Sequence, residues 1–218
     1  MRTLAPQLLP GQKMSRNEFL RRWEELPDVK NAELIDGVVY MASPVSNRHS
    51  TSDALIHGWL TVYVAETPGC QAGCNGTWLM EESAPQPDSN LRILPEHGGQ
   101  SSNDGKYCVG APELVVEVCR SSATHDFGPK LPLYQRAGVR EYMTLALESR
   151  EVVWRELIGG RYTPLTPGND GTLRSKVFPG LWLDPEALLT GDAARLFERL
   201  RAGSESSEHA DFIASLKR

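Results

Sequence analysis

The stretch Pro112–Cys119, PELVVEVC, has the composition of a buried β-strand but carries two carboxylates. Alternation along a strand places Glu113, Val115 and Glu117 on one face and Leu114, Val116 and Val118 on the other. In one interpretation the face with Glu117 meets water. In the other it is buried, and an ionised carboxylate in an apolar interior then needs a proton, a cationic partner or a metal ion.

The length and composition of the chain indicate one globular domain. It has 218 residues, of which 40% are hydrophobic and 23% charged, as is usual for a globular protein with a substantial core. We expect a single domain over 15–203, with an N-terminal extension over 1–14 and a C-terminal tail or short helix over 204–218.

No apolar run approaches the ~20 residues needed to span a bilayer. The first residues are too interrupted by proline for a secretory signal. We therefore expect a cytoplasmic protein that makes no membrane contact.

Charge and cysteine content narrow the classes of partner. Lys and Arg number 23 against 28 Asp and Glu, a net charge of −5, which argues against indiscriminate coating of nucleic acid but leaves room for a local basic groove. Cys70 and Cys74 could form half of a zinc site, although no second pair with matching spacing follows. Walker, G-x-G-x-x-G, H-E-x-x-H and G-x-S-x-G patterns are absent.

The first half of the chain carries clear local signals. Ser15 and Glu18 form a capping box that predicts a helix over 15–26. Asp36-Gly37 predicts a hairpin with strands over 32–35 and 38–42. From Ser46 an apolar stripe at helical spacing predicts a long helix.

A run of strands and shorter helices follows. We expect strands within 76–83, 87–96, 112–119, 140–147 and 151–157, and a helix within 121–139 that ends at Gly138. The segment 95–110 is predicted to be a mobile loop that could serve as a lid. Short strands, a helix capped by Asp184 and a helix over 192–203 complete an α/β or α+β sheet with helices on its faces.

Four polar residues could meet in this fold. Asp88 begins one strand and Glu117 lies near the end of the next, so antiparallel pairing would bring them together. Two carboxylates that close raise each other's pKa unless a divalent cation such as Mg²⁺ lies between them. Lys130 stands near the start of the following helix and could reach back to hold a water or a phosphate. Glu33 is either a third acid of this site or an exposed edge-strand residue.

Several segments together resemble one known family. They are AELIDGVVYMASPVSNRH (32–49), PQPDSN (85–90), GAPELVVEVCRSSATHDFGPKLPLYQRAGVREYMTLAL (110–147) and VVWREL (152–157). The chain is similar, from about Glu18 to Trp182, to the Uma-type family of restriction-endonuclease-like proteins in the PD-(D/E)XK superfamily.

The resemblance implies an α/β (α+β) fold with a central mixed sheet, flanking helices, extra antiparallel strands and a divalent-metal site at one end. It assigns Asp88 as the Asp of the motif, Glu117 as its second acid and Glu33 as the acid from an early strand. Lys130 takes the place of the motif lysine, because Cys119 occupies the usual position.

The expected activity is metal-dependent endonucleolytic hydrolysis of DNA. Mg²⁺ or Mn²⁺ would be held by Asp88, Glu117 and the Val118 carbonyl, with Glu33 completing or supporting the ligands and Lys130 orienting the water.

His49 could bind phosphate or move a proton, and Arg120 could contact phosphate or be merely solvated. We expect a homodimer. The alternatives are a catalytically silent binding or regulatory module with the same fold, and a metal-binding hydrolase for a smaller phosphorylated substrate.

Overall fold

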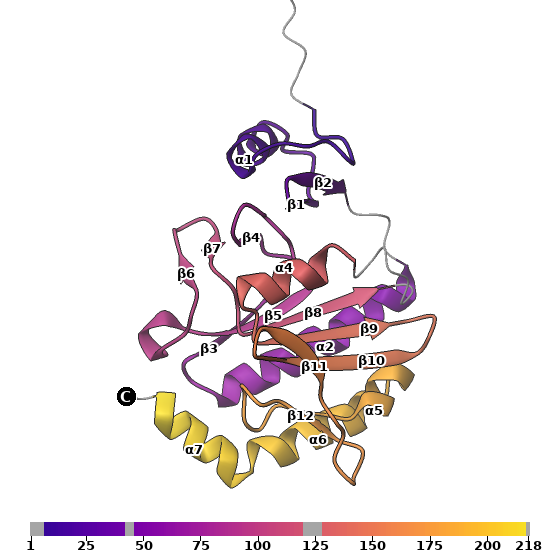
Figure 1. The fold of residues 1–218 in the computed structure, drawn as a ribbon. Coiled ribbons are helices and arrows are strands. Elements are labelled where there is room, and N and C mark those ends of the chain that lie inside the picture. The colour runs from indigo at the N-terminus through magenta and orange to yellow at the C-terminus, as the bar shows by residue number, and fades with distance from the viewer. Residues whose placement is uncertain (1–6, 42–45, 120–127, 217–218) are drawn as a thin grey trace, which may run out of the picture.

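A six-stranded mixed sheet forms the centre of the protein (Figure 1). The computed structural model describes residues 7–41, 46–119 and 128–216. In spatial order the strands are β11 (Arg161–Pro164), β10 (Glu151–Ile158), β9 (Glu141–Ala146), β8 (Leu114–Cys119), β5 (Ser89–Ile93) and β3 (Cys70–Cys74). Only the β8–β9 pair of this sheet is parallel. The expected mixed sheet flanked by helices is confirmed.

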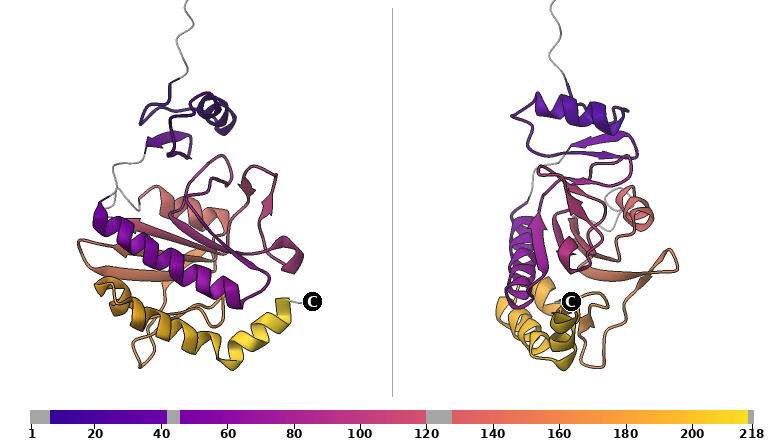
Figure 2. Two further views of the ribbon diagram at one scale, coloured as in Figure 1. Left: turned by 180° about the vertical axis from the view of Figure 1, so that it is seen from behind. Right: turned by 90° about the vertical axis from the view of Figure 1, so that its left-hand side faces the viewer.

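Helices cover both faces of the sheet (Figure 2). One face packs against α2 (Asn47–Glu66), α5 (Pro185–Thr190), α6 (Ala193–Ser204) and α7 (Ser207–Leu216), and α4 (Lys130–Ala137) lies on the other. The largest apolar cluster joins the sheet to α2, α5 and α6, and a second cluster joins it to α4.

The alternation of β8 explains its two carboxylates. Its Leu114, Val116 and Val118 side chains belong to the cluster beneath α2, whereas Val115 belongs to the cluster beneath α4. Glu113 and Glu117 are 1% and 6% exposed. The interpretation that leaves Glu117 in water is therefore wrong, because α4 covers that face.

Glu113 has a structural explanation. Its two carboxylate oxygens accept hydrogen bonds from the backbone N–H groups of Ile93 and Gln100, each at 2.9 Å. Charge-assisted bonds of this kind compensate for burial. Among the described residues no backbone N–H group donates to Glu117 in this way, so its burial still needs an explanation.

Residues 7–41 form an N-terminal unit around a small apolar cluster, which Leu79 and Ala84 complete from the next part of the chain. It contains α1 (Arg16–Glu24), β1 (Ala32–Ile35) and β2 (Val38–Met41), packed around Phe19, Leu34 and Val39. The predicted Asp36-Gly37 turn is confirmed, with φ of +50° and +76°. Alternation along β1 turns Leu34 into this core and Ile35 towards the cluster beneath α4, so Glu33 also points out of the unit's core.

The predicted helix boundaries are confirmed where capping residues set them. Ser46 caps α2 by accepting from His49 N–H, and Asp184 caps α5 by accepting from Ala187 N–H. α4 ends at Gly138, whose φ of +83° suits a residue without a Cβ.

Two sequence interpretations are corrected. The segment 95–110 contains η1 (Pro95–His97), β6 (Ser102–Asn103) and β7 (Cys108–Val109), and the two strands join β4 (Trp78–Leu79) in a small sheet. Cys70 and Cys74 lie at the two ends of β3 and are free thiols. Four residues of extended chain span ~13 Å, too far for the two thiolates to bind one zinc ion.

The C-terminal segment packs on the body of the protein. The chain passes through β12 (Leu173–Arg174) and β13 (Trp182–Leu183) before α5, α6 and α7. In α7, His209 is 2% exposed and Phe212 contacts Phe178 edge-on at 6.3 Å between ring centroids. None of the helices in the described ranges has the length and apolar character needed to cross a membrane.

Candidate active site

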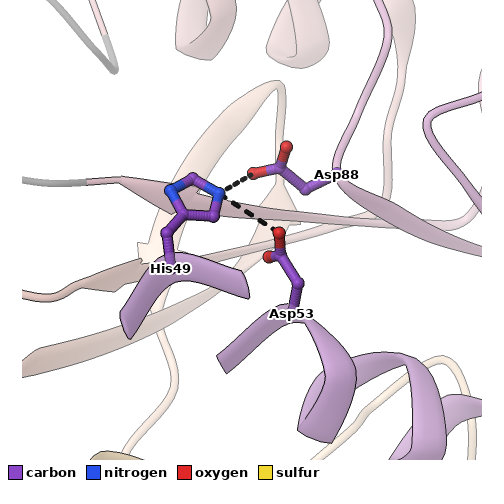
Figure 3. A group of neighbouring side chains, drawn as sticks. All are labelled: His49, Asp53 and Asp88. Atoms are coloured by element: carbon purple, nitrogen blue, oxygen red, sulfur yellow. Dashed lines mark ion pairs between the residues drawn. The ribbon is translucent and has the colours of Figure 1, made fainter. Parts of the chain in front are cut away.

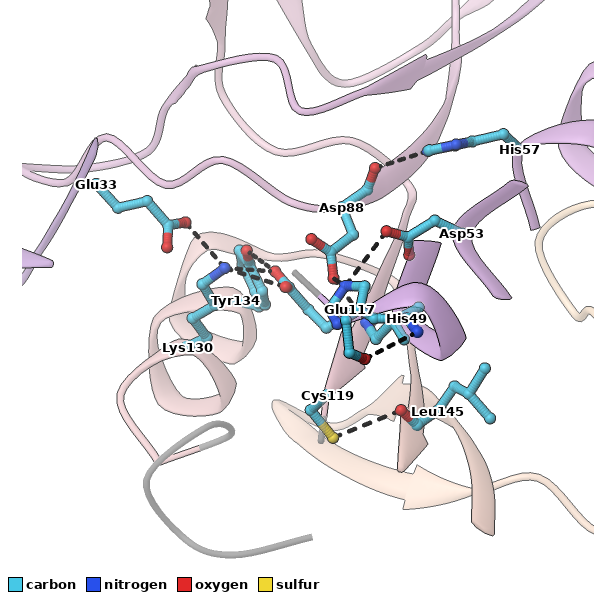
Figure 4. A network of polar contacts seen from close by, with 12 residues as sticks. Glu33, His49, Asp53, His57, Asp88, Glu117, Cys119, Lys130, Tyr134 and Leu145 are labelled. Carbon is cyan, nitrogen blue, oxygen red and sulfur yellow. Dashed lines mark hydrogen bonds and ion pairs between the residues drawn. The ribbon is translucent and has the colours of Figure 1, made fainter. Parts of the chain in front are cut away.

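Sheet register brings the first two acids together (Figure 4). Ser89 of β5 pairs with Val116 of β8 in the antiparallel ladder, which places Asp88 opposite Glu117. The Oδ2 atom of Asp88 accepts a 2.7 Å hydrogen bond from Val118 N–H. These contacts hold the Asp88 carboxylate beside β8.

Helix α4 supplies a cation and a phenol to Glu117. Lys130 Nζ donates to Glu117 Oε1 and Oε2 at 2.9 and 3.0 Å, and Tyr134 OH donates to Oε1 at 2.7 Å. Lys130 Nζ also lies 2.9 Å from Oε1 of Glu33. One ammonium therefore bridges a carboxylate of the central sheet and a carboxylate of the N-terminal unit.

Glu33 is held by the chain that leads into β5. Its Oε1 accepts from Gln86 N–H at 2.6 Å, and its side chain is 19% exposed. The interpretation of Glu33 as an exposed edge residue is therefore wrong, because β1 lies against this loop.

A second group of ligand-type atoms adjoins Asp88 (Figure 3). His49 Nε2 lies 3.2 Å from Asp53 Oδ2 and 3.9 Å from Asp88 Oδ2. In the part of the chain that the structure describes, one atom from each of these three residues lies within 4.8 Å of the others. Asp53 Oδ1 is buried and has no hydrogen-bond partner among the described residues.

The electrostatics reflect an excess of negative charge. Burial, reinforced by Asp88 and Glu33 and opposed by Lys130, raises the pKa of Glu117 to about 8. Burial also raises the pKa of Asp88, against the effects of Lys130 and the Val118 N–H. The hydrogen bond to Asp53 raises the pKa of His49.

These residues fit a divalent cation. The charged groups are the carboxylates Glu33, Asp53, Asp88 and Glu117, the Lys130 ammonium and the His49 imidazole. Carboxylate oxygens suit Mg²⁺ and Mn²⁺, and an imidazole nitrogen is a common ligand for first-row metals. The orphaned Asp53 oxygen would gain a partner from such an ion.

The structure thus joins Glu33, Asp88, Glu117 and Lys130 in one network and places His49 at its margin. Val118 contributes its N–H to Asp88. Arg120 lies outside the described residues.

Sequence analysis did not identify two further residues of this region, Asp53 and Tyr134. Asp53 lies four residues after His49 on the predicted helix, a spacing that shares one face and could have indicated it. Tyr134 stands at helical spacing with the apolar residues Leu131 and Ala137, and this pattern gives no sign of its hydrogen bond to Glu117.

A cavity in the described part of the protein lies elsewhere. It measures about 460 Å³ and is lined by residues of α2, α5 and α6, among them Arg48, Leu55 and Phe197. None of the clustered carboxylates lines it. The cavity and the cluster of carboxylates are therefore separate features of the protein.

The chain matches a known protein family over most of its length. The family model described as "Uma2: Putative restriction endonuclease" matches residues 16–186. The chain belongs to the Uma2 family. The match spans every residue of the network, and membership of the Uma2 family supports a nuclease.

A solved structure shares the fold. The crystal structure of a putative nuclease belonging to DUF820 from Anabaena variabilis aligns with a TM-score of 0.62 and 14% sequence identity, and covers 81% of this chain and 98% of that one. At this identity the likeness establishes the fold alone. No curated protein matches the chain.

Proposed function

We propose that the protein is an endonuclease that uses Mg²⁺ or Mn²⁺ to hydrolyse phosphodiester bonds in DNA. The observation that carries the proposal is the convergence of Glu33, Asp53, Asp88 and Glu117 on a region with one lysine. Within the described residues these buried or partly buried carboxylates outnumber their cationic partners, which is unfavourable unless a further cation enters. Membership of the Uma2 family supports the nuclease reaction.

Asp88 has the central role in our assignment of ligands. It faces Glu117 across the β5–β8 ladder and His49 and Asp53 on its other side. We assign Asp88, Glu117 and the Val118 carbonyl as ligands, with Glu33, His49 and Asp53 available to complete the set. A bound Mg²⁺ or Mn²⁺ would polarise the phosphoryl oxygens and make water a better nucleophile.

The remaining side chains act on protons and positions. Lys130 can orient the attacking water or donate to a phosphoryl oxygen, which places positive charge where negative charge develops. Glu33 holds the Lys130 ammonium from the side opposite Glu117. His49, whose pKa is raised by Asp53, can carry a proton for the departing oxygen. Asp53 and Asp88 both lie close to His49, and their negative charges would repel a phosphate. Proton transfer therefore suits His49 better than phosphate binding does.

The experiment measures cleavage and metal binding on the full chain. Supercoiled plasmid, a DNA duplex, an RNA oligonucleotide and bis-p-nitrophenyl phosphate would be incubated with Mg²⁺, Mn²⁺ or EDTA. Asp88→Asn and Glu117→Gln should abolish metal-dependent cleavage, while Glu151→Gln, at an exposed acid of β10, should not.

Each outcome has a defined meaning. Metal binding without cleavage of any nucleic acid, but with hydrolysis of the small ester, would replace the proposal with a small-phosphoester hydrolase. Neither binding nor cleavage would indicate a silent module, for which the closed Glu33–Lys130–Glu117 ion pairs would be the structural basis. Cleavage of RNA but not DNA would correct the substrate.

We retain the homodimer and the domain over 15–203 as parts of the proposal. Light scattering coupled to size exclusion tests the first. Limited proteolysis tests the second, by showing whether a stable core begins near residue 15.

A further inference from the structure

The two oxygens of Glu117 are not equivalent. Oε1 accepts from Tyr134 OH at 2.7 Å and from Lys130 Nζ at 2.9 Å, whereas Oε2 accepts from Lys130 Nζ at 3.0 Å. A carboxylate oxygen has two lone pairs. Oε1 therefore has both lone pairs engaged, and Oε2 keeps one available with respect to the described residues.

The Tyr134 hydroxyl is fixed by its surroundings. Tyr134 is 0% exposed and lies one helical turn after Lys130 on α4. Its ring packs against Tyr142 at 5.3 Å between centroids, with an interplanar angle of 63°. A buried ring in contact with a second ring cannot swing away, so the phenol presents its donor at one position.

We propose that Tyr134 is a positioning residue that holds Glu117 with Oε2 directed to the divalent cation. The inference rests on the proposed function, in which Glu117 is a metal ligand. Without the hydroxyl, Oε1 regains a free lone pair and the carboxylate can turn between orientations. Partners of ligating carboxylates typically change metal affinity or activity 10- to 100-fold when they are removed.

The chain offers a matched control for this test. Tyr142 is also 0% exposed and belongs to the same apolar cluster, but its hydroxyl has no hydrogen-bond partner within the described ranges. Tyr134→Phe and Tyr142→Phe each remove one buried phenolic oxygen and keep the ring. They differ in the bond to Glu117.

The experiment compares both variants with the wild-type chain in Mn²⁺ binding, followed by the electron paramagnetic resonance of free Mn²⁺, and in steady-state cleavage of a DNA duplex. For Tyr134→Phe we expect the Mn²⁺ Kd to rise and kcat to fall, each by about 10-fold or more. KM for DNA should stay within about twofold. Both variants should stay folded, with Tyr134→Phe slightly less stable because it alone loses a hydrogen bond. If Tyr134→Phe acted only by loosening the packing, Tm would fall and kcat would not decrease while KM stayed the same.

The results separate this inference from the proposed function. If the wild-type chain cleaves DNA and Tyr134→Phe keeps the same Mn²⁺ affinity and kcat, the positioning role is overturned and the proposed function stands. Equal losses in both variants would overturn it too, because packing would then be responsible. A wild-type chain that neither binds Mn²⁺ nor cleaves DNA would overturn the proposed function and, with it, this inference.

Discussion

Lys130 Nζ lies 2.9 and 3.0 Å from the two carboxylate oxygens of Glu117, although one residue begins α4 and the other lies in β8. Glu33 holds the same ammonium at 2.9 Å. Lys130 therefore links the central sheet, α4 and the N-terminal unit. Its ammonium neutralises part of the negative charge of the carboxylates, and a bound metal ion would neutralise the rest.

Removing this ammonium should destabilise the metal-free protein. Lys130→Met leaves Glu33 and Glu117 without their shared cation, and breaking a buried ion pair in this way costs about 3 kcal/mol. Urea denaturation at pH 8 measures the loss, with Lys176→Met at an exposed lysine as the control. Because Glu117 becomes protonated at lower pH, the loss should shrink at pH 5. A loss of equal size at both pH values would contradict the electrostatic explanation.

Glu117→Gln should have the opposite effect on stability. Burial raises the pKa of Glu117 to about 8 from an ordinary 4.5, so the folded metal-free protein binds this proton more tightly than the unfolded chain. The free energy of unfolding should therefore fall as pH rises from about 4.5 to about 8. Glutamine removes that dependence and should raise stability at pH 8, while cleavage is lost. The finding that would count against this is a variant less stable than wild type at pH 8.

Asp53→Asn tests the residue that sequence reasoning missed. The hydrogen bond to Asp53 is the main cause of the raised pKa of His49, so the substitution should lower that pKa in the metal-free protein. Proton NMR of the imidazole measures it. The same variant should weaken Mn²⁺ binding about 10-fold. An unchanged Mn²⁺ affinity would exclude Asp53 from the ligand set.

Glu141 provides a contrasting buried carboxylate. It accepts from Ser175 Oγ at 2.7 Å, from Lys176 N–H at 2.6 Å and from Trp154 Nε1 at 3.2 Å, and none of these partners is a proposed ligand. Glu141→Gln replaces one acceptor with a donor and should destabilise by about 2 kcal/mol. Chemical denaturation and Mn²⁺ titration together check this: stability should fall and metal affinity should not.

The parts of the fold that the sequence predicted are those with strong local chemistry. Asp36-Gly37, the cap at Ser46, Gly138 and the cap at Asp184 each fix the backbone through a turn or a cap. β3 was not predicted, because its sequence CQAGC lacks the β-branched and aromatic residues that favour strands. Its extended form comes from pairing with β5.

In the candidate site, too, some features follow from the sequence and others depend on tertiary packing. The meeting of Asp88 and Glu117 follows from consecutive antiparallel strands, which sequence order can suggest. Tyr134 donates to Glu117 because of how α4 lies across β8. The spacing of apolar residues along a helix does not predict such a tertiary contact. The burial of Glu33 likewise depends on the docking of β1 against the loop at Gln86.

Glu33 reaches the network from a unit whose core is much smaller than that of the central sheet. Small clusters open at lower free energy than large ones, so local melting of residues 7–41 should withdraw Glu33 while β8, α2 and α4 remain folded. The temperature at which cleavage is lost should therefore lie below the global calorimetric transition, and inactivation at that lower temperature should be reversible on cooling.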